Sequence, residues 1–135
     1  MVPVIFKRIA TLNTVLTIDD NDTIRQNVQD ILSIEGFEVL TAENGSDGIA
    51  MANSHLPDLV LCDITMPGID GYEVLRRLRE EESTTTIPFV FLTALDTRDD
   101  IRKGMGIGGD DYLTKPFTVE ELLTAVKSRL DRSAE

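Results

Sequence analysis

Five short segments of mostly apolar residues recur along the chain from residue 14 onward, and each has the length of one β-strand. The first, Thr14 to Ile18, contains no charged residue, which is typical of a strand that is buried on both faces of a sheet. The other four are residues 37–42, residues 59–62, residues 87–92 and the short pair at 112–113. The pattern therefore predicts five strands.

Segments with helical spacing separate these strands. After Asn21 or Asp22, either of which can cap a helix, apolar residues recur on one helical face until Gly36 ends the pattern. Thr118 and Glu121 form a capping box for a last helix that extends to about residue 132. Three further helices are predicted over residues 44–55, 71–81 and 97–106, and glycines at 104 and 106 make the third of these the loosest.

Alternating strands and helices predict an α/β fold in which a doubly wound, five-stranded parallel sheet carries helices on both faces. The flavodoxin-like strand order 2-1-3-4-5 is compatible with the pattern, and its switch point lies between strands 1 and 3. No repeat, low-complexity segment or linker divides the sequence. We expect an extended or disordered N-terminal arm at residues 1–13, one domain over residues 14–132 and a short tail at residues 133–135.

The charge of the chain narrows the classes of partner. Its 24 acidic and 13 basic side chains give a formal net charge of −11, which repels nucleic-acid phosphates and anionic lipid and favours cationic partners or divalent metal. A single cysteine, Cys62, excludes an internal disulfide and a cysteine-based zinc site, and it suits a reducing compartment such as the cytoplasm. No apolar run approaches the length of a membrane span.

Polar residues follow four of the predicted strands at the point where each ends. Asp19 and Asp20 follow the first strand, Asp63 the third, Thr93 the fourth and Lys115 the fifth. In open α/β sheets the functional site lies beyond the carboxyl ends of the strands, so these side chains are expected in one crevice.

Three carboxylates and one ammonium leave two net negative charges, which one Mg²⁺ with hard oxygen ligands would neutralise. Such a site suits a phosphoryl group. Asp63 is the best candidate for the nucleophile, Asp19 and Asp20 form the metal pair, and Thr93 and Lys115 contact the phosphoryl oxygens.

The sequence from about Thr14 to Arg132 resembles a response-regulator receiver domain of two-component signalling. The matching motifs are Val-Leu-Thr-Ile-Asp19-Asp20, Leu-Val-Leu-Cys-Asp63-Ile-Thr-Met-Pro67-Gly-Ile-Asp-Gly71, Phe-Leu-Thr93-Ala94 and Asp-Asp-Tyr112-Leu-Thr-Lys115-Pro116-Phe117. The combination of these motifs is specific to the family, whereas each motif alone is weak.

The resemblance implies that a histidine kinase or a histidine phosphotransfer protein phosphorylates Asp63. It also implies that Mg²⁺ is bound by Asp20, Asp63 and the backbone carbonyl of Thr65, with Asp19 acting through water. Thr93 would then move toward the phosphoryl group, Tyr112 would swing inward behind it, and the bond between Lys115 and Pro116 would be cis. The switching face would comprise the fourth helix, fifth strand and fifth helix, a surface that also allows a homodimer; the downstream target stays open.

Two local expectations concern other residues. Leu95 stands where the family tunes attack of water on the phosphoryl-aspartate, and because its side chain cannot hydrogen-bond water we expect slow self-dephosphorylation. Arg76, Arg77 and Arg79 are expected to pair with the acidic run at residues 80–82.

The main alternative is a Mg²⁺-dependent phosphohydrolase of the haloacid dehalogenase type with an aspartate nucleophile. Such enzymes need a second aspartate two residues further on, where this chain has Thr65. A flavin carrier would place a hydroxyl- and glycine-rich loop after the first strand, where the acidic residues found here would repel phosphate, and no nucleotide-binding P-loop motif is present. A signalling phosphoacceptor, which is not an enzyme, is therefore the preferred interpretation.

Overall fold

The computed structural model describes residues 13–94, 102–103, 105–106 and 108–134, the last four of these in backbone only. Five parallel strands form one sheet in the order β2-β1-β3-β4-β5, which confirms the predicted topology. The strands are β1 (Thr14–Ile18), β2 (Glu38–Ala42), β3 (Leu59–Asp63), β4 (Phe89–Thr93) and β5 (Asp111–Thr114). The expected arm, apart from Asn13, lies outside the described residues, so its conformation stays a prediction.

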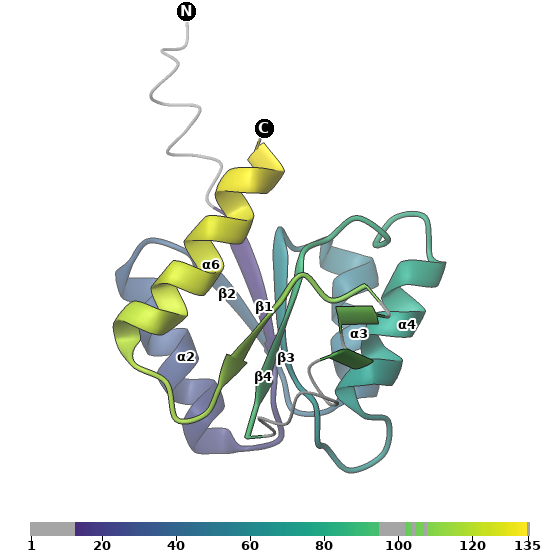
Figure 1. The fold of residues 1–135 in the computed structure, drawn as a ribbon, viewed down its shortest axis with the longest axis horizontal. Helices are drawn as coiled ribbons and strands as arrows, with labels where there is room; N and C mark the ends of the chain where they lie inside the picture. Colours follow the sequence, from purple (N-terminus) through teal and green to yellow (C-terminus); the bar gives the residue numbers. More distant parts are fainter. Residues whose placement is uncertain (1–12, 95–101, 104, 107, 135) are drawn as a thin grey trace, which may run out of the picture.

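Helices cover both faces of the sheet, as the pattern predicted (Figure 1). One layer contains α2 (Asp22–Ile34) and α6 (Val119–Ala134), and the other contains α3 (Gly45–His55) and α4 (Gly71–Glu80). Of the helix expected over residues 97–106, the described residues 102, 103, 105 and 106 are helical, and the rest lies outside the described part of the chain.

The central strands supply side chains to two separate apolar cores. Leu16 and Ile18 of β1 point into the core beneath α3 and α4, whereas Val15 of the same strand belongs to the core beneath α2 and α6. All five residues of β3 and of β4 are buried, as is typical of central strands with helices on both faces of the sheet. Polar side chains on these strands therefore reach solvent only at the strand ends.

The helix ends carry the predicted signals. Asn21, rather than Asp22, caps α2, with its side chain accepting a hydrogen bond from the Ile24 amide. Gly36 follows α2 with a φ of +94°, a conformation that glycine adopts without penalty. The capping box of α6 is formed: the Thr118 amide donates to the Glu121 carboxylate, and the Glu121 amide donates to the Thr118 hydroxyl.

The expected pairing of the α4 arginines with residues 80–82 is wrong. Arg76 and Arg77 pair with Glu73, one helical turn earlier, at 2.5 and 3.0 Å. Arg79 leaves the helix surface and bonds the Ile87 and Gly108 carbonyls and the Asp110 carboxylate. Arg76 and Arg77 therefore pair with the acidic residue three and four positions before them on the same helix. Arg79 pairs instead with a residue that is distant in the sequence.

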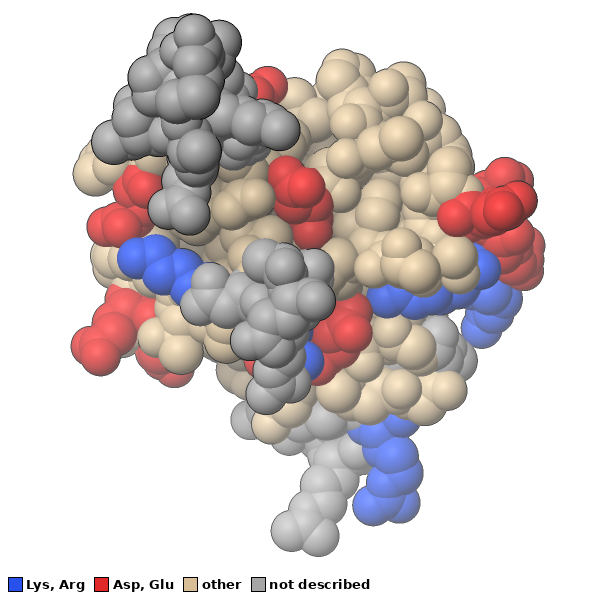
Figure 2. Space-filling model, turned by 90° about the horizontal axis from the view of Figure 1, so that it is seen from above, with Lys and Arg blue, Asp and Glu red and all other residues tan. Residues whose placement is uncertain are grey.

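The surface seen from above carries acidic and basic side chains at several separate places rather than in one patch of either sign (Figure 2). None of the helices in the described part of the chain combines the length and apolar character that a membrane span requires.

Candidate functional site

Three carboxylates meet at the carboxyl ends of β1 and β3. These strands are neighbours in the sheet, with Ile18 paired to Cys62, so the residues that follow the paired positions, Asp19 and Asp63, emerge side by side. One carboxylate oxygen from each of Asp19, Asp20 and Asp63 lies within 4.8 Å of the others. The structure therefore brings together the aspartates that the sequence placed at the switch point.

Lys115 joins this cluster from the other end of the chain. Its ammonium lies 2.8 Å from Oδ2 of Asp19 and 3.4 Å from Oδ2 of Asp63. Its backbone amide donates to the carbonyl of Thr93 at 2.8 Å, so the residue after β5 is held against the end of β4. The bond between Lys115 and Pro116 is cis, as the resemblance implied.

The two buried carboxylates have different surroundings. Asp19 is fully buried, and its second oxygen, Oδ1, accepts the Asn21 amide at 2.9 Å. Burial raises the pKa of Asp63 above its ordinary value of 3.8; the ammonium of Lys115 opposes this effect and the charge of Asp19 adds to it. A further cation beside Asp63 would oppose this effect of burial and favour the ionised carboxylate.

The loop after β3 is drawn tightly against the site. The Gly71 amide donates to the carbonyl of Ile64 at 2.8 Å. A Cβ on Gly71 would lie 2.4 Å from the Asp63 backbone oxygen, which leaves no room for any side chain. Thr65 is exposed in this loop, two residues beyond the strand end; the assignment of its carbonyl as a metal ligand stays a prediction.

The two candidate switch residues lie on neighbouring strands. Thr93 ends β4 and is 2% exposed, while Tyr112 on β5 pairs with Phe91 and is 39% exposed. Tyr112 is therefore partly exposed to solvent in this structure, whereas Thr93 is buried. Leu95 lies outside the described residues.

The donor set fits magnesium. The cluster offers carboxylate oxygens only, two of them buried and one, on Asp20, exposed, and Mg²⁺ prefers a few hard oxygen ligands with several positions left to water or phosphoryl oxygens. Cys62, the neighbour of Asp63, is no competing ligand, because burial raises the pKa of its thiol and its Sγ bonds the Asp63 carbonyl.

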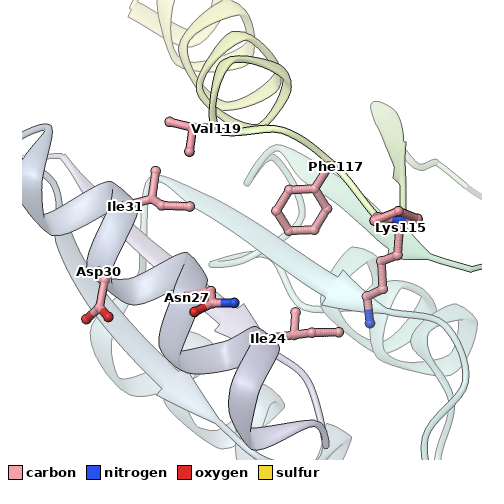
Figure 3. Close-up of a pocket in the computed structure, with 8 residues that line it drawn as sticks. Ile24, Asn27, Asp30, Ile31, Lys115, Phe117 and Val119 are labelled. Atoms are coloured by element: carbon pink, nitrogen blue, oxygen red, sulfur yellow. The ribbon is translucent and has the colours of Figure 1, made fainter.

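An apolar groove of about 450 Å³ opens beside Lys115, between α2 and the segment that leads into α6. Ile24, Ile31, Phe117 and Val119 point into it, and Asn27 and Asp30 lie along its α2 side (Figure 3).

The sequence reasoning missed Arg25 at the site, and it named Gly71 only as part of a motif, without its contact to Asp63. Arg25 donates to the backbone carbonyl of Asp19 at 2.7 Å, and Gly71 makes the close approach described above. The sequence did offer a sign of each contact. Arg25 is a basic residue three positions after Asp22, in the first turn of a predicted helix, and Gly71 is a glycine at the start of another.

The fold and the pocket define a doubly wound α/β domain with three carboxylates and one lysine ammonium at its switch point. The family model described as response regulator receiver domain matches residues 15–127. The chain therefore belongs to the response regulator receiver family, whose members are signalling phosphoacceptors rather than enzymes.

Relatives and solved structures agree. The chain is 40% identical over 120 residues to the phosphate regulon transcriptional regulatory protein PhoB of Pseudomonas aeruginosa, a match that covers 89% of this chain and 52% of PhoB. It is 40% identical over 116 residues to protein PilH of the same organism, covering 86% of this chain and 96% of PilH. The chemotaxis response regulator CheY4 of Vibrio cholerae matches with a TM-score of 0.84 and 31% identity, over 88% of this chain and 99% of that structure. The chain spans about half the length of the first curated relatives.

Proposed function

We propose that Asp63 accepts a phosphoryl group from the phosphohistidine of a histidine kinase or a histidine phosphotransfer protein, in a Mg²⁺-dependent reaction. The observation that carries the proposal is the convergence of Asp19, Asp20, Asp63 and Lys115 at the switch point of the sheet. Membership of the receiver family supports the same assignment.

The ionised Asp63 carboxylate attacks phosphorus, and the bond from phosphorus to the donor nitrogen breaks. The electron pair of that bond stays on the donor imidazole, and Asp63 becomes an acyl phosphate. Lys115, within 3.4 Å of Asp63, offers its ammonium to the new phosphoryl oxygens, and the Thr93 hydroxyl at the end of β4 donates a hydrogen bond to them. Transfer depends on charge neutralisation and positioning, since the protein forms only one covalent bond.

Asp20, Asp63 and the Thr65 carbonyl would hold the Mg²⁺, with Asp19 contributing through water. The ion supplies charge neutralisation between the carboxylates and the phosphoryl oxygens. Burial raises the pKa of Asp63, so its carboxylate ionises less readily than one in water. A bound cation would favour the ionised form that attacks phosphorus.

Phosphorylation would alter the surface formed by the helical residues near 102–106, β5 and α6. The Thr93 hydroxyl moves toward the phosphoryl group, which frees space behind the Thr93 side chain. Tyr112, which is 39% exposed on the adjacent strand, then turns inward to fill that space. A downstream partner or a second copy of the chain that distinguishes the two states then reads the signal.

Intact mass spectrometry after incubation with acetyl phosphate and Mg²⁺ tests the proposal. The native protein should gain one phosphoryl group, Asp63→Asn should gain none, and Asp30→Asn, an exposed α2 carboxylate, should behave as the native protein. A native protein without added mass, or an Asp63→Asn variant with it, contradicts the assignment. Sustained turnover of a small phosphate ester would instead favour the phosphohydrolase alternative.

A further inference from the structure

We propose that Arg25 is a positioning residue for the metal site, because it fixes the peptide that joins Asp19 to Asp20 and so aims the Asp20 carboxylate. The inference rests on the proposed function, since it assumes that Asp20 binds Mg²⁺. It assigns a task to Arg25, whose side chain binds the Asp19 backbone and which is not among the predicted site residues.

Arg25 lies in the first turn of α2, where its backbone amide donates to the Asn21 carbonyl. Its side chain turns back toward the end of β1 and is only 18% exposed. One arm of the guanidinium donates to the Asp19 carbonyl at 2.7 Å, and the other lies 2.5 Å from the Asp22 carboxylate. The planar group is therefore held at two points, which a single ammonium cannot reproduce.

The carbonyl that Arg25 binds belongs to the planar unit that continues into the Asp20 amide. Fixing its oxygen fixes the rotation of that plane, and with it the direction in which the Asp20 side chain leaves the backbone. Asp19 needs no such help, because both of its carboxylate oxygens have donors, Asn21 and Lys115. Asp20 is exposed, and within the described part of the chain no hydrogen bond holds its carboxylate. Its direction thus depends on the backbone.

Position and charge predict effects of opposite sign, which makes the proposal testable. A guanidinium near the acidic cluster repels Mg²⁺. If Arg25 acted only through its charge, its removal would therefore strengthen Mg²⁺ binding. A positioning role means that removal weakens it, because Asp20 then samples directions that do not ligate. Loss of such an outer partner of a metal ligand typically weakens affinity by roughly 10- to 100-fold.

Isothermal titration calorimetry of the unphosphorylated protein with MgCl₂ measures the sign. Arg25→Met removes the charge and keeps the stem, and Arg25→Lys keeps the charge and loses the two-point attachment. We expect both variants to bind Mg²⁺ about tenfold more weakly than the native protein. Arg77→Met, which removes an exposed arginine of α4, should bind as the native protein does.

A second readout separates positioning from loss of structure. At saturating Mg²⁺ both Arg25 variants should reach the native rate of phosphorylation by acetyl phosphate, with only the half-saturating Mg²⁺ concentration raised. Thermal unfolding in EDTA checks the fold, and Arg25→Lys decides the question if Arg25→Met does not fold. Equal or tighter Mg²⁺ binding by the folded variants overturns the inference, as does a lower saturated rate. A native protein that binds no Mg²⁺ overturns the proposed function instead.

Discussion

The Lys115 ammonium lies 2.8 Å from the Asp19 carboxylate, although the two residues are 96 positions apart in the sequence. Asp19 is fully buried and Lys115 is 14% exposed, so the pair is largely shielded from solvent. The second carboxylate within reach of the lysine, Asp63, is slightly further away. In this structure Lys115 is therefore primarily the counter-ion of Asp19, and it is also placed to meet a group on Asp63.

Removing the Lys115 charge should destabilise the metal-free protein. Lys115→Met leaves the shielded Asp19 and Asp63 carboxylates without their cation, and we expect a loss of about 3 kcal/mol in the free energy of unfolding in EDTA. Lys127→Met breaks an exposed pair with Glu35 and should cost less than about 1 kcal/mol. Urea unfolding with and without Mg²⁺ measures both; equal losses in the two variants, or no partial recovery with Mg²⁺, would contradict the prediction.

The raised pKa of Asp63 makes stability depend on pH. Because the folded-state pKa lies above the ordinary value of 3.8, the folded protein holds the proton more tightly than the unfolded chain. The resulting stabilisation is complete below the unfolded pKa and is lost as the pH rises through the folded pKa. In EDTA at neutral pH, Asp63→Asn should therefore be more stable than the native protein, and the advantage should shrink as the pH falls toward 3.8. Denaturant midpoints over the acid range check this; an advantage that grows on acidification would show the opposite sign.

The close packing of Gly71 predicts a local lesion. Gly71→Ala would place a Cβ 2.4 Å from the Asp63 carbonyl oxygen, so the loop after β3 has to shift. We expect a loss of roughly 1–3 kcal/mol in unfolding free energy, together with weaker Mg²⁺ binding because that loop carries Thr65. Gly106→Ala is the control, since nothing lies within 4 Å of its Cβ position, and it should be neutral or slightly stabilising. An unchanged Gly71→Ala protein in both measurements would contradict the packing argument.

Arg79 should matter more to stability than the other α4 arginines. It bonds the Ile87 and Gly108 carbonyls and the Asp110 carboxylate, which itself accepts the Phe89 amide at 2.7 Å. Arg79→Met is expected to lose about 2 kcal/mol, because partly buried acceptors lose a charged donor. Arg76→Met, at an exposed pair with Glu73, should lose less than about 1 kcal/mol. Chemical unfolding of both proteins ranks them, and a reversed order would contradict the prediction.

Leu95 sets an expectation for the lifetime of the phosphorylated state. An apolar side chain two residues after Thr93 offers attacking water no hydrogen bond. Leu95→Asn should therefore release phosphate several times faster than the native protein once acetyl phosphate is removed. Intact mass over time follows the decay, and Leu95→Met is the control that changes shape without adding a polar group. Equal lifetimes in the native and Leu95→Asn proteins would contradict the prediction.

The fold could be predicted from the sequence because short apolar runs and capping residues indicate where the strands and helices begin and end. Apolar runs define the strands to within two residues at their ends, and Asn21, Gly36 and Thr118 mark helix ends that the structure confirms. The site residues were found through the rule that polar groups gather where parallel strands end.

The features missed are contacts over distance. Arg79 reaches Asp110 across 31 positions, and Gly71 is shaped by the Asp63 carbonyl, so neither contact has a local pattern. Leu56 ends α3 with a φ of +47°, a conformation that a leucine gives no reason to expect.

The hydrogen bond between the Lys115 amide and the Thr93 carbonyl couples two parts of the site mechanically. Any displacement of the end of β4 that carries the Thr93 hydroxyl also pulls on the backbone beneath the lysine. If Thr93 and Lys115 contact the phosphoryl group as proposed, a movement of one residue would be passed to the other through this hydrogen bond. A mutation that loosened the end of β4 would weaken both contacts together.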